Sequence, residues 1–163
     1  TYALDRATGV RTVFEPVSVP KAAALADALD ERIHAVTPDR DELAALTGLP
    51  TRTDRQLRTA AMSLHDRGIE LVWVTLGERG SLLSTTEGVL EVAALPTTVV
   101  DVTGAGDSMI AAFCHVLLEG GSPQDAARLG HAAAALTVAS PHTVRPDLTM
   151  RMIQAALDQE DPS

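Results

Sequence analysis

Stretches with different hydrophobic periods alternate along this chain, and the pattern predicts a layered α/β domain. Residues 71–76 form a nearly continuous apolar run, typical of a strand buried on both faces, and Trp73 is assigned to its core. Leucine and alanine recur at helical spacing in residues 54–67, and Gly68 ends that stretch. Two further short strands are expected at residues 12–14 and 33–36, and helices at residues 19–31, 39–46, 123–139 and 148–157.

The middle of the chain changes from strand-like to helix-like patterning. Gly80 and Gly88 stand between short apolar pairs within residues 77–92, which predicts an antiparallel hairpin. A strand at residues 99–102 is then expected to feed a loop of small residues, and a strongly apolar helix follows as far as residue 118. Neither a repeat nor a Gly/Ser linker divides the chain, so residues 1–163 are predicted to form one unit.

Composition narrows the classes of protein to which this chain can belong. Its 163 residues are 45% hydrophobic, enough for a core, and no apolar run approaches the roughly 20 residues of a membrane helix. A net charge of −9 disfavours nucleic acid and anionic membranes as partners, and 2% aromatic residues exclude base-stacking platforms. The single cysteine excludes a disulfide scaffold. These features predict a cytoplasmic protein that handles small molecules, and a start at Thr1 without a methionine indicates a removed upstream segment.

The loop at residues 104–106 carries the most informative chemistry. Gly104, Ala105 and Gly106 let backbone N–H groups approach a ligand, and the following helix adds a partial positive charge. Such a place suits a phosphate or a developing oxyanion. Asp107 follows in the first helical turn, where a carboxylate can accept a proton from a hydroxyl that attacks a phosphoryl group. The alternative is a tight turn in which Asp107 only complements the helix dipole.

The motif around this loop resembles a known family. Asp101-x-x-Gly104-Ala105-Gly106-Asp107, followed by Ala111-Ala112-Phe113, is similar to the C-terminal signature of the ribokinase-like (PfkB) carbohydrate kinases. The resemblance implies the C-terminal portion of a three-layer α-β-α, Rossmann-like sheet and ATP-dependent phosphoryl transfer to a sugar or nucleoside hydroxyl. It also implies that Asp107 is the general base and that the amides of residues 104–106 form the anion hole. Two positions depart from the family pattern: Val102 stands where Thr is common, and Ala112 where Gly is common.

The same resemblance implies a magnesium-linked motif near residue 40. The family carries Asn-x-x-Glu there, and this chain has Asp39-x-x-Glu42, so both residues are expected to help bind Mg²⁺. The change from Asn to Asp adds negative charge, which would alter magnesium affinity. An Asp-x-x-Glu sequence at a helix start also forms a capping box, and both interpretations can hold together.

Further contacts to the nucleotide and to a cation follow from the resemblance alone. Residues expected to bind ATP are Thr75, Gly77, Gly80, Thr103 and His131, although Gly-x-x-Gly by itself most often marks a hairpin turn. Many family members have Asn where His131 stands, and a packing or surface role is the alternative for this histidine. Asp101, Thr103 and residues 139–143 correspond to a monovalent cation site, such as one for K⁺, with a turn-forming role as the alternative for Asp101.

Two segments resemble pseudouridine kinases in particular, namely residues 13–22 and residues 140–148. Pseudouridine is therefore the expected acceptor; another sugar or nucleoside kinase (ribokinase or fructokinase-like) and a non-catalytic nucleotide-binding fragment are the alternatives. The resemblance covers only the C-terminal half of the family's fold, so the lid and most groups that hold the sugar are expected to be missing. The chain alone is therefore expected to be inactive or nearly so. A second chain, as in a homo-oligomer, is expected to cover the exposed sheet edge.

Overall fold

The fold is described from a computed structural model that covers residues 4–7, 9–143 and 145–159. The chain divides into two compact units. The first unit holds residues 1–76 and 81–91, and the second holds residues 77–80 and 92–163.

The first unit is built on a mixed sheet of five strands in the order β1-β2-β3-β4-β5. The strands are β1 (Val13–Phe14), β2 (Ala35–Val36), β3 (Leu71–Thr75), β4 (Ser81–Thr85) and β5 (Gly88–Val92), of which Val92 already belongs to the second unit. The first three strands run parallel, and β4 runs antiparallel to β3. The apolar run predicted as a buried strand is confirmed: Trp73 is fully buried and its indole Nε1–H donates to Ser81 Oγ at 2.7 Å.

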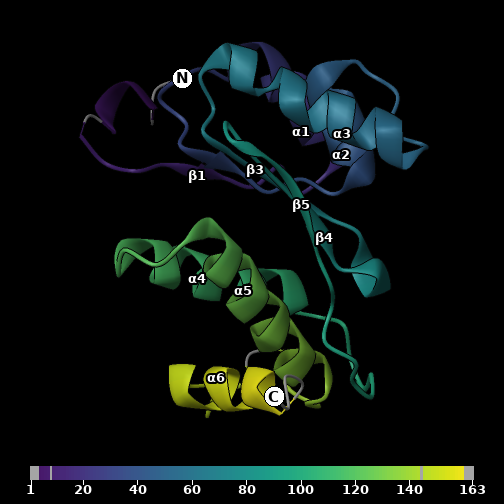
Figure 1. The fold of residues 1–163 in the computed structure, drawn as a ribbon, viewed down its shortest axis with the longest axis vertical. Coiled ribbons are helices and arrows are strands. Elements are labelled where there is room, and N and C mark those ends of the chain that lie inside the picture. The colour runs from purple at the N-terminus through teal and green to yellow at the C-terminus, as the bar shows by residue number, and fades with distance from the viewer. Residues whose placement is uncertain (1–3, 8, 144, 160–163) are drawn as a thin grey trace. The chain divides into compact units, whose positions relative to one another are not determined.

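Three α-helices lie on one face of this sheet (Figure 1). They are α1 (Val19–Leu25), α2 (Arg40–Thr47) and α3 (Asp54–Ser63), with 3₁₀ turns at Leu4–Arg6, Ala26–Ala28 and His65–Arg67. Both α2 and α3 begin with a capping box. It gives hydrogen-bond acceptors to two backbone N–H groups that have no carbonyl acceptor within the helix. The helices predicted at residues 19–31 and 54–67 are shorter than expected, because each passes into a 3₁₀ turn.

The core of the first unit lies between these helices and the sheet. Its members are apolar side chains that are almost completely buried: Ala22, Leu29, Ile33, Val36, Leu43, Leu46, Leu57, Ala60, Ala61, Leu64, Ile69, Val72, Val74 and Leu82. Their spacing is every third or fourth residue in the helices and every second residue in β3, as the sequence pattern predicts.

The second unit is a layer of three helices: α4 (Ala105–Leu118), α5 (Pro123–Val138) and α6 (Met150–Asp158). Helix α5 packs against both of the others. Small side chains fill this contact, since Ala112, Ala132 and Ala133 are buried together with Ile153. Alanine allows two helix backbones to approach closely. The first turn of α4 and the last turn of α5 are therefore close enough for short polar side chains to contact each other.

The strand predicted at residues 99–102 is wrong. The structure has neither helix nor strand from residue 93 to residue 104. Val99, Val100 and Val102 are 54, 59 and 68% exposed, so their hydrophobic side chains do not mark a buried strand. The amides of Val100 and Asp101 instead donate to Val138 O at the end of α5, at 2.7 and 3.2 Å. An irregular segment held by a helix end therefore leads into the small-residue loop.

In the described part of the chain, no helix combines the length and the apolar character that crossing a bilayer requires.

Candidate active site

The loop before α4 is shaped by the carboxylate of Asp101. Asp101 Oδ1 accepts hydrogen bonds from the backbone N–H of Thr103 at 2.9 Å and from the Thr103 hydroxyl at 2.7 Å. These two bonds lower the pKa of Asp101, since they favour its charged form. The turn-forming role considered for Asp101 is therefore present. Its part in binding a cation stays a prediction.

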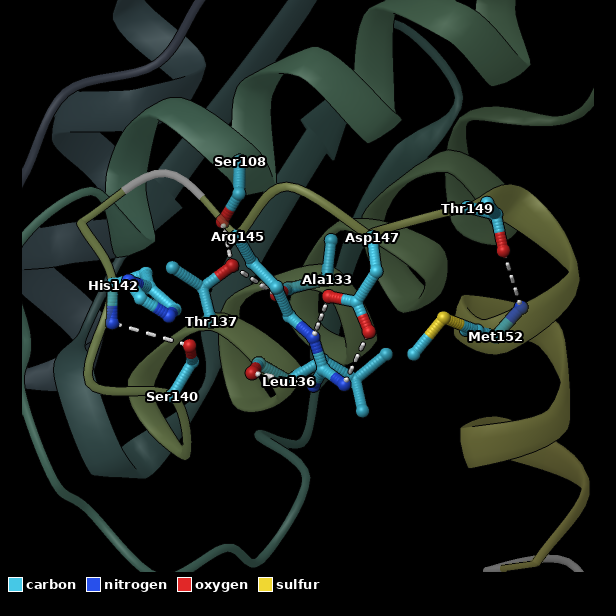
Figure 2. A network of polar contacts seen from close by, with 10 residues as sticks. All are labelled: Ser108, Ala133, Leu136, Thr137, Ser140, His142, Arg145, Asp147, Thr149 and Met152. Carbon is cyan, nitrogen blue, oxygen red and sulfur yellow. Dashed lines mark hydrogen bonds and ion pairs between the residues drawn. The ribbon is translucent and has the colours of Figure 1, made fainter.

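Gly104 joins this loop to the helix in a conformation that only glycine adopts readily. Its φ is +81°, and an added Cβ would lie 1.9 Å from the carbonyl oxygen of Thr143. Arg145, two residues after Thr143, anchors this part of the chain to α5. Its guanidinium donates to Leu136 O at 3.1 Å and forms an ion pair with Asp147 (Figure 2). The close approach of two backbones thus fixes the place at which α4 begins.

The start of α4 leaves backbone donors and one carboxylate unused. Gly104 is the N-cap residue and offers no side-chain acceptor to the first turn. The amide of Ala105 donates to Val102 O at 3.3 Å, whereas those of Gly106 and Asp107 have no acceptor among the described residues. The Asp107 side chain is exposed at the third helical position. Two free amides and a carboxylate therefore lie within one helical turn, where the helix dipole favours an anion.

A second group of predicted residues gathers in the first unit, where β2 and β3 end. Thr75 pairs with Asp39 in an isolated parallel bridge, and the Thr75 amide donates to Pro38 O at 3.0 Å. Asp39 caps α2: its Oδ1 accepts from the Glu42 amide at 2.8 Å, and Glu42 Oε2 accepts from the Asp39 amide at 2.9 Å. The structure therefore brings Asp39, Glu42 and Thr75 together at the carboxyl ends of parallel strands, a common place for ligands in α/β sheets.

The capping box considered for Asp39 and Glu42 is present, and it leaves room for a metal role. One oxygen of each carboxylate is used in the box, while Oδ2 of Asp39 and Oε1 of Glu42 have no donor among the described residues. Glu42 is only 7% exposed, and burial raises its pKa because it disfavours the charged carboxylate. A nearby cation would have the opposite effect and favour the charged form. No described cluster of three or more His, Cys, Asp or Glu side chains could hold a metal by itself. Mg²⁺ fits such a pair, because it takes one or two carboxylates together with phosphate oxygens and water.

The Gly77 to Gly80 turn belongs to the same compact unit as the loop before α4. Residues Gly77–Arg79 form a 3₁₀ turn closed by a bond from the Gly80 amide to Gly77 O at 3.0 Å. An added Cβ at Gly80 would lie 2.0 Å from Val92 O, whereas one at Gly77 would meet nothing within 4 Å. Gly80 therefore has a packing role, and open space lies beside Gly77.

His131 lies inside the second unit on α5 and is 5% exposed. Burial lowers its pKa to about 4, because the charged imidazolium loses its hydration there. The structure thus favours the packing role that was the alternative for this residue. A contact to ATP stays a prediction.

The buried His131 is expected to make stability depend on pH. The unfolded chain takes up a proton at His131 near the ordinary pKa of 6.5, and the folded chain does so only near 4. The stability contributed by the neutral form is therefore complete above pH 6.5 and is lost as the pH falls toward 4, by on the order of 3 kcal/mol. Urea unfolding at pH 7, 5.5 and 4.5 should show His131→Asn to be less pH-dependent than the parent. His115→Gln, a change at an exposed histidine of α4, should retain the parental slope, and equal slopes for all three proteins would contradict the prediction.

Two polar residues of the second unit were not anticipated from the sequence. Ser108 follows Asp107 directly, and Thr137 interrupts an alanine-rich stretch of α5. Their hydroxyl oxygens are 2.9 Å apart, although 29 positions separate them in the chain (Figure 2). A threonine in the otherwise apolar sequence of residues 132–138 was the only signal of this contact.

Comparison with known proteins points to one family. The family described as pfkB family carbohydrate kinase matches residues 3–150. A 1-phosphofructokinase from Haloferax volcanii is 41% identical over 120 residues, which is 74% of this chain and 39% of that protein. A pseudouridine kinase from Escherichia coli is 26% identical over 161 residues, which is 98% of this chain and 51% of that protein.

A solved structure shares the fold. The ribokinase of Arabidopsis thaliana, complexed with ribose and ATP, superposes with a TM-score of 0.76 at 29% identity, covering 91% of this chain and 48% of that one. The α/β class and the ribokinase-like fold expected from the sequence are therefore confirmed. The chain spans about half or less of the length of these relatives.

Proposed function

Because this chain belongs to the pfkB family of carbohydrate kinases, we propose that it is the nucleotide-binding and catalytic part of an enzyme that transfers the γ-phosphoryl group of ATP to a sugar or nucleoside hydroxyl. The observation that carries this proposal is the start of α4. There the exposed Asp107 carboxylate lies in the same helical turn as the unused amides of Gly106 and Asp107. The ribokinase that shares this fold binds ribose and ATP.

In the proposed reaction Asp107 accepts the proton of the acceptor hydroxyl. The hydroxyl oxygen then forms a bond to the γ-phosphorus of ATP, while the bond from that phosphorus to the β–γ bridging oxygen breaks and ADP leaves with that electron pair. Charge spreads over the phosphoryl oxygens in the transition state. The amides of Gly106 and Asp107 donate to those oxygens.

Mg²⁺ would neutralise phosphate charge in this reaction, and Asp39 and Glu42 are the residues that would hold it. Each keeps one carboxylate oxygen for the ion or for its bound water while the other oxygen caps α2. Asp101 and residues 139–143 would take a monovalent cation such as K⁺. Thr75, Thr103 and the turn at Gly77 would contact ATP.

Glu42→Gln separates the metal role from the capping role. A glutamine oxygen can accept the Asp39 amide bond, as Gln56 already does for Thr53 at the start of α3, at 3.1 Å. The fold should therefore persist, whereas the Mg²⁺ concentration for half-maximal activity should rise by about tenfold or more through loss of the charge. A magnesium titration of kinase activity, with thermal unfolding as the control, measures both. An unchanged magnesium requirement in a folded variant would remove Glu42 from the metal site.

We propose pseudouridine as the acceptor, converted to pseudouridine 5′-phosphate. The pseudouridine kinase of Escherichia coli matches along 98% of this chain, which favours that substrate. The higher identity to a 1-phosphofructokinase favours another sugar kinase as the alternative. An assay of the full-length protein with ATP and a panel of pseudouridine, uridine, ribose, fructose and fructose 1-phosphate, followed by ³¹P NMR, decides between them.

The panel supports the specific proposal if kcat/KM for pseudouridine exceeds that for every other acceptor. If a sugar is the preferred acceptor, the proposed kinase activity stands and the proposed acceptor is wrong. ATP binding without transfer to any acceptor would favour the non-catalytic alternative. The same assay on the 163-residue chain alone tests whether it suffices for transfer.

A further inference from the structure

Two hydroxyl groups connect the first turn of α4 with the last turn of α5. Thr137 Oγ1 lies 2.9 Å from Ser108 Oγ and 2.9 Å from Ala133 O, and Ser108 Oγ lies 3.0 Å from Ala105 O. Figure 2 shows the Ser108 and Thr137 side chains directed toward each other. Thr137 is 1% exposed, so this contact is shielded from water.

The protons of this pair allow a continuous chain of donors. Each hydroxyl has a single proton, so Thr137 can donate to only one of its two neighbours at a time. When Thr137 donates to Ser108 Oγ, the Ser108 proton is free to donate to Ala105 O. Both hydroxyls are then satisfied, and a line of hydrogen bonds runs from the end of α5 to the first residue of α4.

The same turn of α5 also holds the other side of the Gly104 loop. Val138 O, one residue after Thr137, accepts the amides of Val100 and Asp101. Consecutive residues of α5 thus hold the chain before the loop and the chain after it. Gly106 and Asp107 lie between these two attachments, which are at Asp101 and at Ser108.

A threonine at this position of α5 has a cost for the helix. Threonine forms helices less readily than alanine, which occupies residues 132–135 just before it. If its hydroxyl only needed an acceptor, Ala133 O in the preceding turn would suffice. The bond to Ser108 is the feature that a purely local role does not require.

We propose that Thr137, acting through Ser108, is a positioning residue that sets the direction of the Asp107 carboxylate and of the Gly106 and Asp107 amides. This inference rests on the proposed function, in which Asp107 is the general base. A base displaced from its acceptor hydroxyl loses rate without losing nucleotide affinity, so the expected signature is a change in kcat with little change in KM for ATP.

The test compares Thr137→Val with Thr137→Ser in the full-length protein. Valine keeps the shape of threonine and removes the hydroxyl, whereas serine keeps the hydroxyl. We expect Thr137→Val to lower kcat by about tenfold or more, with KM for ATP within about twofold, and Thr137→Ser to restore kcat to within about threefold of the parent. Residual dipolar couplings of the Gly106 and Asp107 amides should change in the valine variant and return toward parental values in the serine variant.

Thr47→Val is the matched control. Thr47 lies in α2 of the first unit, and its hydroxyl donates to Leu43 O at 2.8 Å, so the change removes the same kind of helix bond from a helix other than α5. It should leave kcat unchanged. Parental couplings in Thr137→Val would overturn the inference whatever the activity, and so would a folded Thr137→Val enzyme with parental kcat. Failure of the proposed function is recognised separately, because Asp107→Asn would then be as active as the parent or the parent would transfer no phosphate.

Discussion

Replacing Asp107 with asparagine in the full-length protein is expected to lower kcat by about 10²- to 10⁴-fold, the range contributed by a general base. Asparagine has nearly the shape of aspartate and keeps an oxygen at the same place, but it does not accept the proton of the acceptor hydroxyl. The residues proposed to contact ATP, namely Thr75, Thr103 and the turn at Gly77, are unchanged in the variant, so ATP should bind with nearly parental affinity. Steady-state kinetics and calorimetric titration with a non-hydrolysable ATP analogue measure the two effects.

Asp125→Asn provides a control for the loss of a carboxylate from a helix start. Asp125 occupies the third position of α5, as Asp107 does in α4. Its amide donates to the Ser122 hydroxyl oxygen at 3.0 Å, an ordinary N-cap bond. Both variants remove one favourable interaction with a helix dipole, and only the change at Asp107 should remove catalysis. Equal kcat values in the two variants would show that Asp107 acts on the helix and not on the substrate.

Gly104→Ala is expected to destabilise the second unit strongly. Left-handed backbone costs an L-residue about 1–2 kcal/mol, and overpacking against a backbone adds about 1–3 kcal/mol. At Gly104 both apply, because φ is +81° and the new Cβ would lie 1.9 Å from Thr143 O. We therefore expect a loss of about 3 kcal/mol or more in the free energy of unfolding. Urea unfolding followed by circular dichroism measures it.

Gly48→Ala isolates the contribution of the backbone angle. Gly48 ends α2 with φ +70°, and an added Cβ there would meet nothing within 4 Å. This variant should lose only about 1–2 kcal/mol. The difference between the two variants measures the contact between residue 104 and Thr143. A loss at Gly104 no greater than that at Gly48 would mean that the segment carrying Thr143 moves aside.

Local signals in the sequence predicted most of the elements, and non-local contacts explain what they missed. The capping residues Asp39 and Glu42 are three positions apart, so the beginning of α2 could be located from the sequence alone. The valines at residues 99–102 suggested a strand because hydrophobic pattern does not say which acceptor a backbone amide will find. Here the acceptor is Val138 O, almost forty positions later.

In the candidate site too, the sequence predicts the local features and misses the non-local contacts. The small-residue loop and Asp107 are adjacent in the chain, so their chemistry follows from residue types and spacing. The contact of Gly104 with Thr143 and that of Ser108 with Thr137 join residues far apart in the chain, and both depend on how closely α4 and α5 approach. Side chains as small as those of Ala132 and Ala133 permit that approach, but alanine content does not specify which residues will meet.

The path of the chain has a consequence for attempts to dissect this protein. Residues 77–80 belong to the second unit although they interrupt the sequence of the first, and Gly80 lies against the backbone of residues 92–94. A gene fragment that starts at residue 92 would therefore encode three helices without the turn that Val92 contacts. One that stops at residue 91 would carry that turn without its partner. The two units are compact in space but not modular in sequence, so deletion mapping or domain exchange would disrupt both.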